Sequence, residues 1–176
     1  MKKIIIIGCP GSGKSTLALT LHEKTQLPLT HLDMLFWNAD RTTVSREIFL
    51  ERLQAVMQKD CWILDGNYST TMELRMSACD TVIFLDYPAD VCLDGIRKRR
   101  GKVRPDLPWI ETGDTPDYEE FLAYIRDFET NRRPQILTLL ERFPEKHLLH
   151  FTNRAQAQYF LDNIELTGGV INGISG

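Results

Sequence analysis

The sequence lacks both a long hydrophobic run and a paired cysteine motif. The apolar run at residues 4–7 stops at Gly8, well short of the apolar core of a signal peptide, and no other stretch is long enough to span a bilayer. The four cysteines are dispersed, without the spacing of a zinc site or a disulfide framework. We therefore expect reduced thiols, no membrane segment and a cytoplasmic protein.

Positive charge is not in excess either. The formal net charge of −3 argues against a dedicated, sequence-independent DNA-binding domain, which is usually basic, although local basic clusters can still contact phosphates. The 176 residues, 43% hydrophobic and 26% charged, suit one globular domain with a full core. Nothing in the composition calls for a second domain, and the oligomeric state cannot be predicted from it.

Residues 8–15 read Gly-Cys-Pro-Gly-Ser-Gly-Lys-Ser and fit the phosphate-binding pattern G-x-x-x-x-G-K-[ST] directly after an apolar run. The glycines of such a loop let backbone N–H groups close on phosphate oxygens, and the following helix directs its positive N-terminus to the same place. We predict that Lys14 reaches the β- and γ-phosphates of ATP and that Ser15 binds Mg²⁺. The residues expected to bind the nucleotide are Gly8, Pro10, Gly11, Ser12, Gly13, Lys14, Ser15 and Thr16.

Short apolar runs alternate with longer helical patterns, which is typical of a parallel sheet covered by helices on both faces. The predicted fold is therefore α/β, a P-loop NTPase three-layer α/β/α sandwich with a five-stranded parallel sheet. We predict strands at 3–8, 29–32, 62–65, 81–86 and 147–151, and helices at 14–25, 45–59, 70–76, 89–100, 117–142 and 155–164.

Two segments depart from this alternation. Residues 101–116 contain three prolines and several charges, so we interpret them as a lid inserted into a single P-loop domain at residues 1–166. Residues 167–176 are rich in glycine and have no periodic apolar pattern. We expect them to form a disordered tail.

Aspartates end three of the predicted strands. Ligands of doubly wound sheets bind beyond the carboxyl ends of the strands, so Asp33 and Asp65 should converge on the phosphates. Asp65 suits hydrated Mg²⁺, with a turn or helix cap as its alternative role. Asp33 either orients the acceptor and takes its proton or caps the next segment. Asp86 competes for the metal role, but the Tyr87-Pro88 pair after it favours entry into a helix.

Basic residues surround the predicted lid. Phosphoryl transfer depends on positioning and on neutralisation of charge, so cations on a closing segment are expected. We predict catalytic roles for Arg99 and Arg132, and a solvated helix face is the alternative for such basic runs. The other basic residues near the lid are Arg97, Lys98, Arg100, Lys102, Arg104, Arg126 and Arg133.

Together these motifs resemble the adenylate-kinase-like nucleotide and small-molecule kinases over roughly residues 1–164. The resemblance rests on the phosphate loop, Asp-Met-Leu at 33–35, Asp-Gly at 65–66, Arg-Arg at 99–100 and Arg-Arg-Pro at 132–134. It implies an adenylate-kinase-like fold with a short lid, ATP and Mg²⁺ as cofactors, and Arg99 facing the phosphates. More narrowly, residues 31–37, 65–68 and 104–106 look like the bacterial DNA topology modulation (FlaR-like) proteins.

The acceptor side departs from that family. Adenylate kinases carry one arginine directly after Asp-Met-Leu, where this chain has Phe36. They carry another at the end of Asp-Gly-Phe-Pro-Arg, whereas in this chain Asp-Gly is followed by Asn67-Tyr68-Ser69. Each missing arginine is a charge-assisted, bidentate phosphate contact, so AMP should bind weakly. Arg75 on the following helix could replace one of them. The family's adenine-stacking arginine aligns with Gly95.

The sequence therefore predicts an ATP- and Mg²⁺-dependent phosphotransferase that acts on a nucleotide, a nucleoside or another small acceptor. A pocket built from Phe36, Trp37, Asn67 and Tyr68 favours a nucleoside or another small hydroxylated molecule, although Phe36 and Trp37 can equally cover a helix face. The alternative is an ATP-binding regulatory protein linked to DNA topology, in which residues 97–104 contact nucleic acid; the acidic balance disfavours it. A third possibility is a nucleotide hydrolase without an acceptor.

Overall fold

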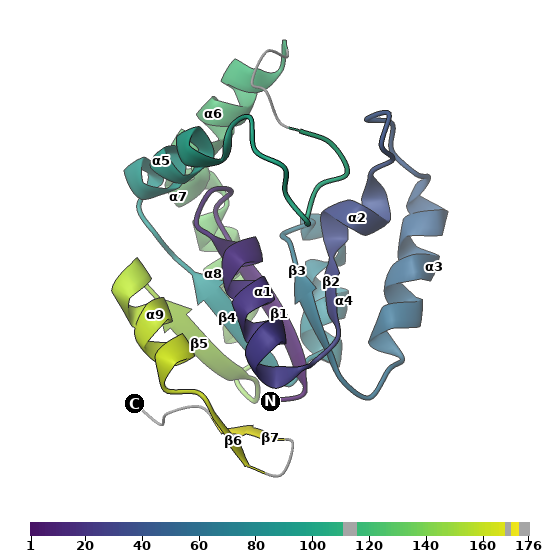
Figure 1. The fold of residues 1–176 in the computed structure, drawn as a ribbon, viewed down its shortest axis with the longest axis vertical. Helices are drawn as coiled ribbons and strands as arrows, with labels where there is room; N and C mark the ends of the chain where they lie inside the picture. The colour runs from purple at the N-terminus through teal and green to yellow at the C-terminus, as the bar shows by residue number, and fades with distance from the viewer. Residues whose placement is uncertain (111–115, 168–169, 173–176) are drawn as a thin grey trace.

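The computed structural model describes residues 1–110, 116–167 and 170–172. A parallel sheet runs through it with the strand order β2-β3-β1-β4-β5 (Figure 1). The predicted α/β sandwich with a five-stranded parallel sheet is confirmed. The strands are β1 (Lys3–Gly8), β2 (Leu29–His31), β3 (Trp62–Asp65), β4 (Thr81–Leu85) and β5 (His147–Phe151).

The central strand β1 is buried on both faces. Its four consecutive isoleucines, at residues 4–7, are fully buried, and Ile5 lies opposite Leu64 of β3 and Val82 of β4. Burying one such side chain stabilises the fold by about 1.5–3 kcal/mol. A continuous apolar run is typical of parallel strands covered on both faces. The core thus holds the strand that leads into the phosphate loop and places Gly8 at the carboxyl edge of the sheet.

Helices cover both faces of the sheet, with α1 and α9 on one side and α4 and α8 on the other (Figure 1). α1 contacts β1, β2, β3 and α9, and α9 contacts β5. None of the helices described is both long and apolar enough to cross a membrane. The helices are α1 (Lys14–Thr25), α2 (Leu32–Phe36), α3 (Arg46–Met57), α4 (Ser69–Ala78), α5 (Ala89–Arg99), α6 (Tyr118–Arg126), α7 (Phe128–Asn131), α8 (Arg133–Glu141) and α9 (Arg154–Asp162).

The prediction of a single long helix at residues 117–142 is wrong, because the structure divides this segment into α6, α7 and α8. Pro134 lies in the first turn of α8, where its missing N–H needs no partner within the helix. Inside a continuous helix the same proline would remove a hydrogen bond and its ring would clash with the preceding turn. The chain therefore starts a new helix at Arg133.

Smaller differences occur elsewhere. The strand predicted at residues 29–32 ends at His31, and α2 follows at once, because Leu32 already has a helical conformation. In the expected disordered tail, β7 (Val170–Asn172) pairs antiparallel with β6 (Glu165–Thr167), in keeping with the strand preference of Val170 and Ile171. Residues 168–169 and 173–176 of that tail, and 111–115 of the predicted lid, lie outside the described residues.

Candidate functional site

The phosphate loop joins β1 to α1 and packs against α5. A Cβ atom on Gly11, where φ is +85°, would lie 2.1 Å from the carbonyl oxygen of Cys92, and one on Gly95 would lie 2.0 Å from the carbonyl oxygen of Gly11. Since Cβ atoms in real proteins essentially never approach a heavy atom within 3.0 Å, both positions require glycine. The loop and α5 thus touch through their backbones, which explains a glycine where adenylate kinases have their adenine-stacking arginine.

Lys14 crosses the inside of the loop. Its Nζ donates to the carbonyl oxygens of Gly8 at 2.9 Å and Cys9 at 3.1 Å. Burial lowers the pKa of Lys14, and the nearby charge of Asp65 opposes that shift. The hydroxyl of Ser12 is buried and has no hydrogen-bond partner among the described residues. The loop therefore offers a cation and an unused hydroxyl to an anionic ligand.

Two cavities of about 580 Å³ and about 550 Å³ flank the loop, and we call them the aromatic cavity and the loop cavity. Lys14, Ser15, Arg99, Arg104 and Asp106 line both, so charged groups gather where the two spaces meet. The rings that line the aromatic cavity belong to His31, Trp37, Tyr68, Trp109, Tyr118, Phe121 and Tyr124. Of the predicted nucleotide-binding residues, Gly11, Ser12, Gly13, Lys14, Ser15 and Thr16 line the loop cavity, whereas Pro10 lines the aromatic cavity.

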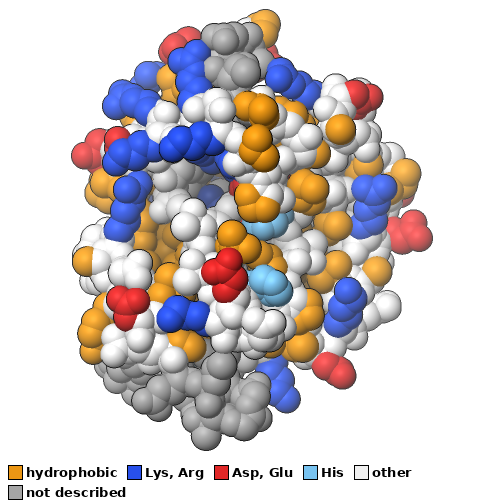
Figure 2. Space-filling model, viewed as in Figure 1, with side chains coloured by type: hydrophobic (Ala, Val, Ile, Leu, Met, Phe, Trp, Pro, Cys, Tyr) orange, Lys and Arg blue, Asp and Glu red, His pale blue; other side chains and the backbone are white. Residues whose placement is uncertain are grey.

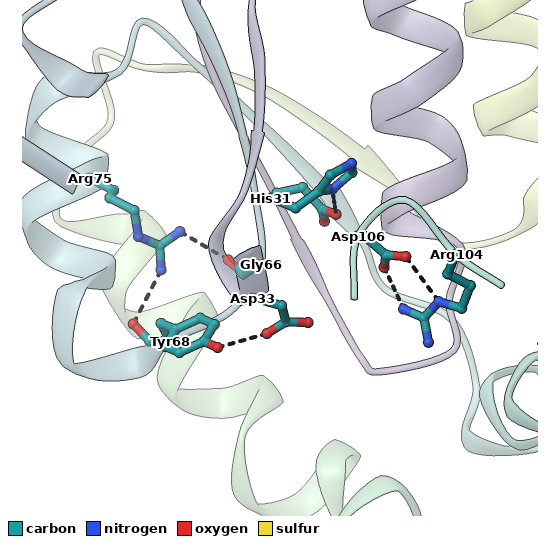
Figure 3. A network of polar contacts seen from close by, with 8 residues as sticks. His31, Asp33, Gly66, Tyr68, Arg75, Arg104 and Asp106 are labelled. Atoms are coloured by element: carbon teal, nitrogen blue, oxygen red, sulfur yellow. Dashed lines mark hydrogen bonds and ion pairs between the residues drawn. The ribbon is translucent and has the colours of Figure 1, made fainter. Parts of the chain in front are cut away.

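Asp65 and His31 form a buried pair at the carboxyl ends of β3 and β2. The two residues are register partners, and His31 Nδ1 lies 2.8 Å from Asp65 Oδ2 (Figure 3). The second oxygen of Asp65, Oδ1, is buried and has no hydrogen-bond partner in the described part of the chain. Sequence reasoning assigned no role to His31, because the pairing of its strand with β3 is not visible in the spacing of the residues.

The groups around Ser15 fit Mg²⁺. This ion binds oxygen ligands, keeps several of its waters and is usually held by one or two carboxylates plus substrate phosphates. Ser15 supplies a hydroxyl, and Asp65 Oδ1 is an unpartnered, buried carboxylate oxygen on the wall of the same cavity. Among the described residues no group of three or more His, Cys, Asp or Glu side chains could hold a metal by itself. These groups suit a metal that arrives with a nucleotide.

Asp33, on α2, faces the aromatic cavity and is held by Tyr68. The Tyr68 hydroxyl donates to Asp33 Oδ1 at 2.7 Å (Figure 3). Burial raises the pKa of Asp33, the hydrogen bond from Tyr68 opposes the shift, and the negative charges of Asp65 and Asp106 add to it. A carboxylate with a raised pKa accepts a proton from a hydroxyl more readily than an ordinary aspartate does.

Arg75 and Asn67 hold the backbone beside this aspartate. Arg75 is fully buried and donates to the carbonyl oxygens of Gly66 at 2.9 Å and Tyr68 at 3.2 Å (Figure 3). It also donates to the carbonyl oxygen of Asn67. Its guanidinium therefore does not replace a missing phosphate-binding arginine in the cavity. The Asn67 side chain accepts from the N–H of Gly8 at 3.1 Å and donates to the carbonyl of Gly8 at 2.8 Å.

The predicted catalytic arginines differ in position. Arg99 lines both cavities, as expected for a group near transferring phosphate. Arg132 lines neither, and its guanidinium lies 5.8 Å from the ring centroid of Tyr124, which does line the aromatic cavity. Arg133 pairs with Asp86, its Nε lying 2.8 Å from Oδ1 of that residue.

Asp86 is thus held by its ion pair with Arg133 rather than serving as a helix cap. His150 on β5 is a second partner of the same carboxylate, with Nε2 lying 2.8 Å from Asp86 Oδ2. Neither cavity is lined by Asp86. These contacts support the preference for Asp65 over Asp86 as the carboxylate near the phosphates.

Comparisons with known proteins show the fold of the chain. No protein-family model matches it, and no curated protein matches its sequence. A solved shikimate kinase from Acinetobacter baumannii, in complex with shikimate, is 19% identical with a TM-score of 0.57, covering 92% of this chain and 89% of that one. A shikimate kinase from Bacteroides thetaiotaomicron is also 19% identical with a TM-score of 0.54, covering 90% of this chain and 93% of that one. The resemblance to FlaR-like proteins is not confirmed by these comparisons. The chain has the adenylate-kinase-like P-loop fold that shikimate kinases share.

Proposed function

We propose that this protein is an ATP- and Mg²⁺-dependent kinase of a small hydroxylated molecule that carries no phosphate. The observation that carries the proposal is the meeting of two cavities at Lys14, Ser15, Arg99, Arg104 and Asp106. A phosphoryl donor in one cavity and an acceptor in the other would place the transferred group among these charges. Such positioning and charge neutralisation supply most of the catalysis in phosphoryl transfer.

The loop cavity suits the donor. The phosphates of ATP would lie on the backbone of the loop and beside Lys14, whose ammonium is already held on the loop carbonyls. Ser15 and Asp65 are the residues proposed here to hold Mg²⁺, which would neutralise charge that develops on the phosphates. Arg99, at the end of α5, lines the same cavity and would face the γ-phosphate.

The aromatic cavity suits a neutral acceptor. Asp33 would accept the proton of the acceptor hydroxyl as the phosphorus–oxygen bond forms, and Tyr68 keeps the carboxylate oriented. Arg75, the substitute for an acceptor-phosphate arginine, is fully engaged with backbone carbonyls instead. The surrounding rings provide apolar contact for a sugar or a planar base. A phosphate-bearing acceptor such as AMP would lack the two arginines that adenylate kinases use, and Arg41 is the arginine that lines this cavity without also lining the loop cavity.

ATP consumption by the purified protein with Mg²⁺ tests the proposal, first alone and then with nucleosides, AMP, shikimate and other small hydroxylated metabolites. Shikimate belongs in the panel because one similar structure holds it. We expect one class of phosphate-free alcohol to stimulate consumption and to gain a phosphoryl group, and Lys14→Ala to abolish turnover while the protein stays folded. Equal consumption with and without every compound would instead indicate a hydrolase.

The regulatory alternative has one observation in its favour, a group of basic side chains at the end of α5. Arg97, Lys98, Arg100 and Lys102 are exposed there, and Figure 2 shows Lys and Arg side chains gathered on the upper part of this face. However, Lys98 pairs with Asp94 at 2.7 Å, and the Arg100 guanidinium lies 5.5 Å from the ring centroid of Tyr118. Salt-dependent binding of duplex DNA together with acceptor-independent ATP binding would favour this alternative over the kinase.

A further inference from the structure

The segment that follows α5 brings a buried carboxylate to the phosphate loop. Asp106 is 3% exposed and lines both cavities. Arg104 donates to it through Nε, at 2.9 Å from Oδ1, and through Nη2 (Figure 3). Ser15 lines the same two cavities, and its hydroxyl lies where it can donate a hydrogen bond to the carboxylate. A residue distant in sequence therefore lies beside the serine that the loop motif assigns to Mg²⁺.

Asp106 is held in place by Arg104, which contacts both of its carboxylate oxygens. It lines the same cavity as Ser15 and Asp65. Buried carboxylates in a site built to receive phosphate suit a Mg²⁺ ion that carboxylates and phosphate oxygens share.

Asp65 points independently to a cation. Its Oδ1 is a buried carboxylate oxygen without a hydrogen-bond partner among the described residues, and the side chain is only 4% exposed. The charges of both Asp65 and Asp106 act on Asp33, so the carboxylates converge on one region. A buried, unpartnered carboxylate oxygen is costly unless a bound ion or water satisfies it.

We propose that Asp106 is the second carboxylate of the Mg²⁺ site, supplied by the loop after α5 and acting together with Ser15 and Asp65. A serine hydroxyl has one proton and two lone pairs, so Ser15 can bind the metal through its oxygen while it still donates its proton to Asp106. The other carboxylate oxygens then accept hydrogen bonds from waters that Mg²⁺ retains. This inference rests on the proposed function, because it requires Mg²⁺ to enter with ATP.

The placement of Asp106 couples the metal to the loop. Asp65 lies on a strand in the core, whereas Asp106 lies in the segment at 101–110, which contributes residues to both cavities. Bound Mg²⁺ with its nucleotide would therefore hold this segment against the phosphate loop. Arg104, two residues earlier, would be carried to the phosphates by the same contact.

The test is the affinity for ATP measured by titration calorimetry, in excess Mg²⁺ and in EDTA, for the wild type and for Asp106→Asn. The ratio of the two dissociation constants gives the enhancement of binding by Mg²⁺. We expect Asp106→Asn to reduce this enhancement by about 10- to 100-fold, as for other residues that support a metal through hydrogen bonds, while affinity in EDTA stays the same or increases. Asp90→Asn is the matched control. It also replaces an aspartate by asparagine, but Asp90 lies on α5 and lines neither cavity, so the ratio should stay unchanged.

Each other outcome overturns the inference. An unchanged ratio in Asp106→Asn, with loss of the enhancement only in Asp65→Asn, would assign the metal to the strand carboxylate alone. Tighter ATP binding by an equal factor in both conditions would make Asp106 an anion that merely occupies the phosphate site. Equal weakening in both would indicate a structural role. A wild-type protein that binds no ATP at all would overturn the proposed function as well, which separates the two failures.

Limited digestion with trypsin gives a second readout that does not depend on turnover. Lys102 is exposed and lies four residues before Asp106. We expect ATP with Mg²⁺ to protect the bond after Lys102 in the wild type, and ATP in EDTA to protect it less. In Asp106→Asn the two conditions should give the same cleavage rate, and Mg²⁺-dependent protection in that variant would contradict the coupling.

Discussion

Replacing Gly95 by alanine should push α5 away from the phosphate loop. The new Cβ would lie 2.0 Å from the carbonyl oxygen of Gly11, against a lower limit of 3.0 Å for real contacts, so the backbones must separate by about 1 Å. Overpacking costs about 1–3 kcal/mol, and alanine recovers about 1 kcal/mol over glycine inside a helix. The unfolding free energy should therefore fall by no more than about 2 kcal/mol. Turnover should fall by about 100-fold, because a displacement near 1 Å misaligns the reacting groups.

Thermal unfolding and ATP turnover, measured on the same preparation, separate these two effects. The control is Asp94→Ala, at the adjacent position of α5, which also gains helix preference, though less than a replaced glycine, and loses only an exposed pair with Lys98. A folded Gly95→Ala protein with wild-type turnover and ATP affinity would show that the backbone contact between loop and helix does not position the phosphates.

Three further predictions concern charged groups in the site. Arg75→Met should lower the unfolding free energy in urea by about 3 kcal/mol, because partly buried carbonyl oxygens of residues 66–68 lose their donor at a cost of about 1–3 kcal/mol each; a change below about 1 kcal/mol would contradict this. Arg99→Ala should lower kcat more than ATP affinity, as expected for a group that stabilises charge during transfer; steady-state kinetics and direct ATP-binding measurements test this. If Arg99 only holds the donor, ATP affinity would fall and kcat would change little. Asp33→Asn should remove turnover yet stabilise the fold at pH 7. The pKa of Asp33 is raised in the folded state, so ionisation of Asp33 destabilises the fold as the pH rises above the ordinary aspartate pKa near 4. The melting temperatures of the wild type and of Asp33→Asn should therefore converge as the pH is lowered.

Local patterns were sufficient to predict the sheet and the phosphate loop. The strand at 3–8 and the helix at 14–25 have the predicted bounds, because a buried apolar run and a glycine-rich turn leave the chain few conformations. The start of a new helix at Arg133 could also be predicted in principle, because Pro134 follows it. However, apolar residues recur at helical spacing on both sides of Pro134, which favours one continuous helix.

Long-range polar contacts could not be predicted in the same way. Sequence reasoning offered Arg75 as a substitute for an acceptor-phosphate arginine, whereas the structure buries it on the backbone carbonyls of residues 66–68, which make its burial favourable. Asp106 lies 91 positions after Ser15, and no spacing rule brings the two together. Asp86 joins Arg133 and His150 because β4 and β5 are neighbours, which depends on the strand order.

The double hydrogen bond between Asn67 and Gly8 has a consequence for redesign of the proposed acceptor site. The amide side chain ties the first residue of the phosphate loop to the turn that carries Tyr68. Attempts to change acceptor preference by exchanging residues 66–68 will therefore also disturb nucleotide binding, and libraries at this turn should keep Asn67 fixed. Selectivity is better altered from the far wall of the aromatic cavity, at Trp109 or Phe121, where neither residue contacts Gly8 through a hydrogen bond.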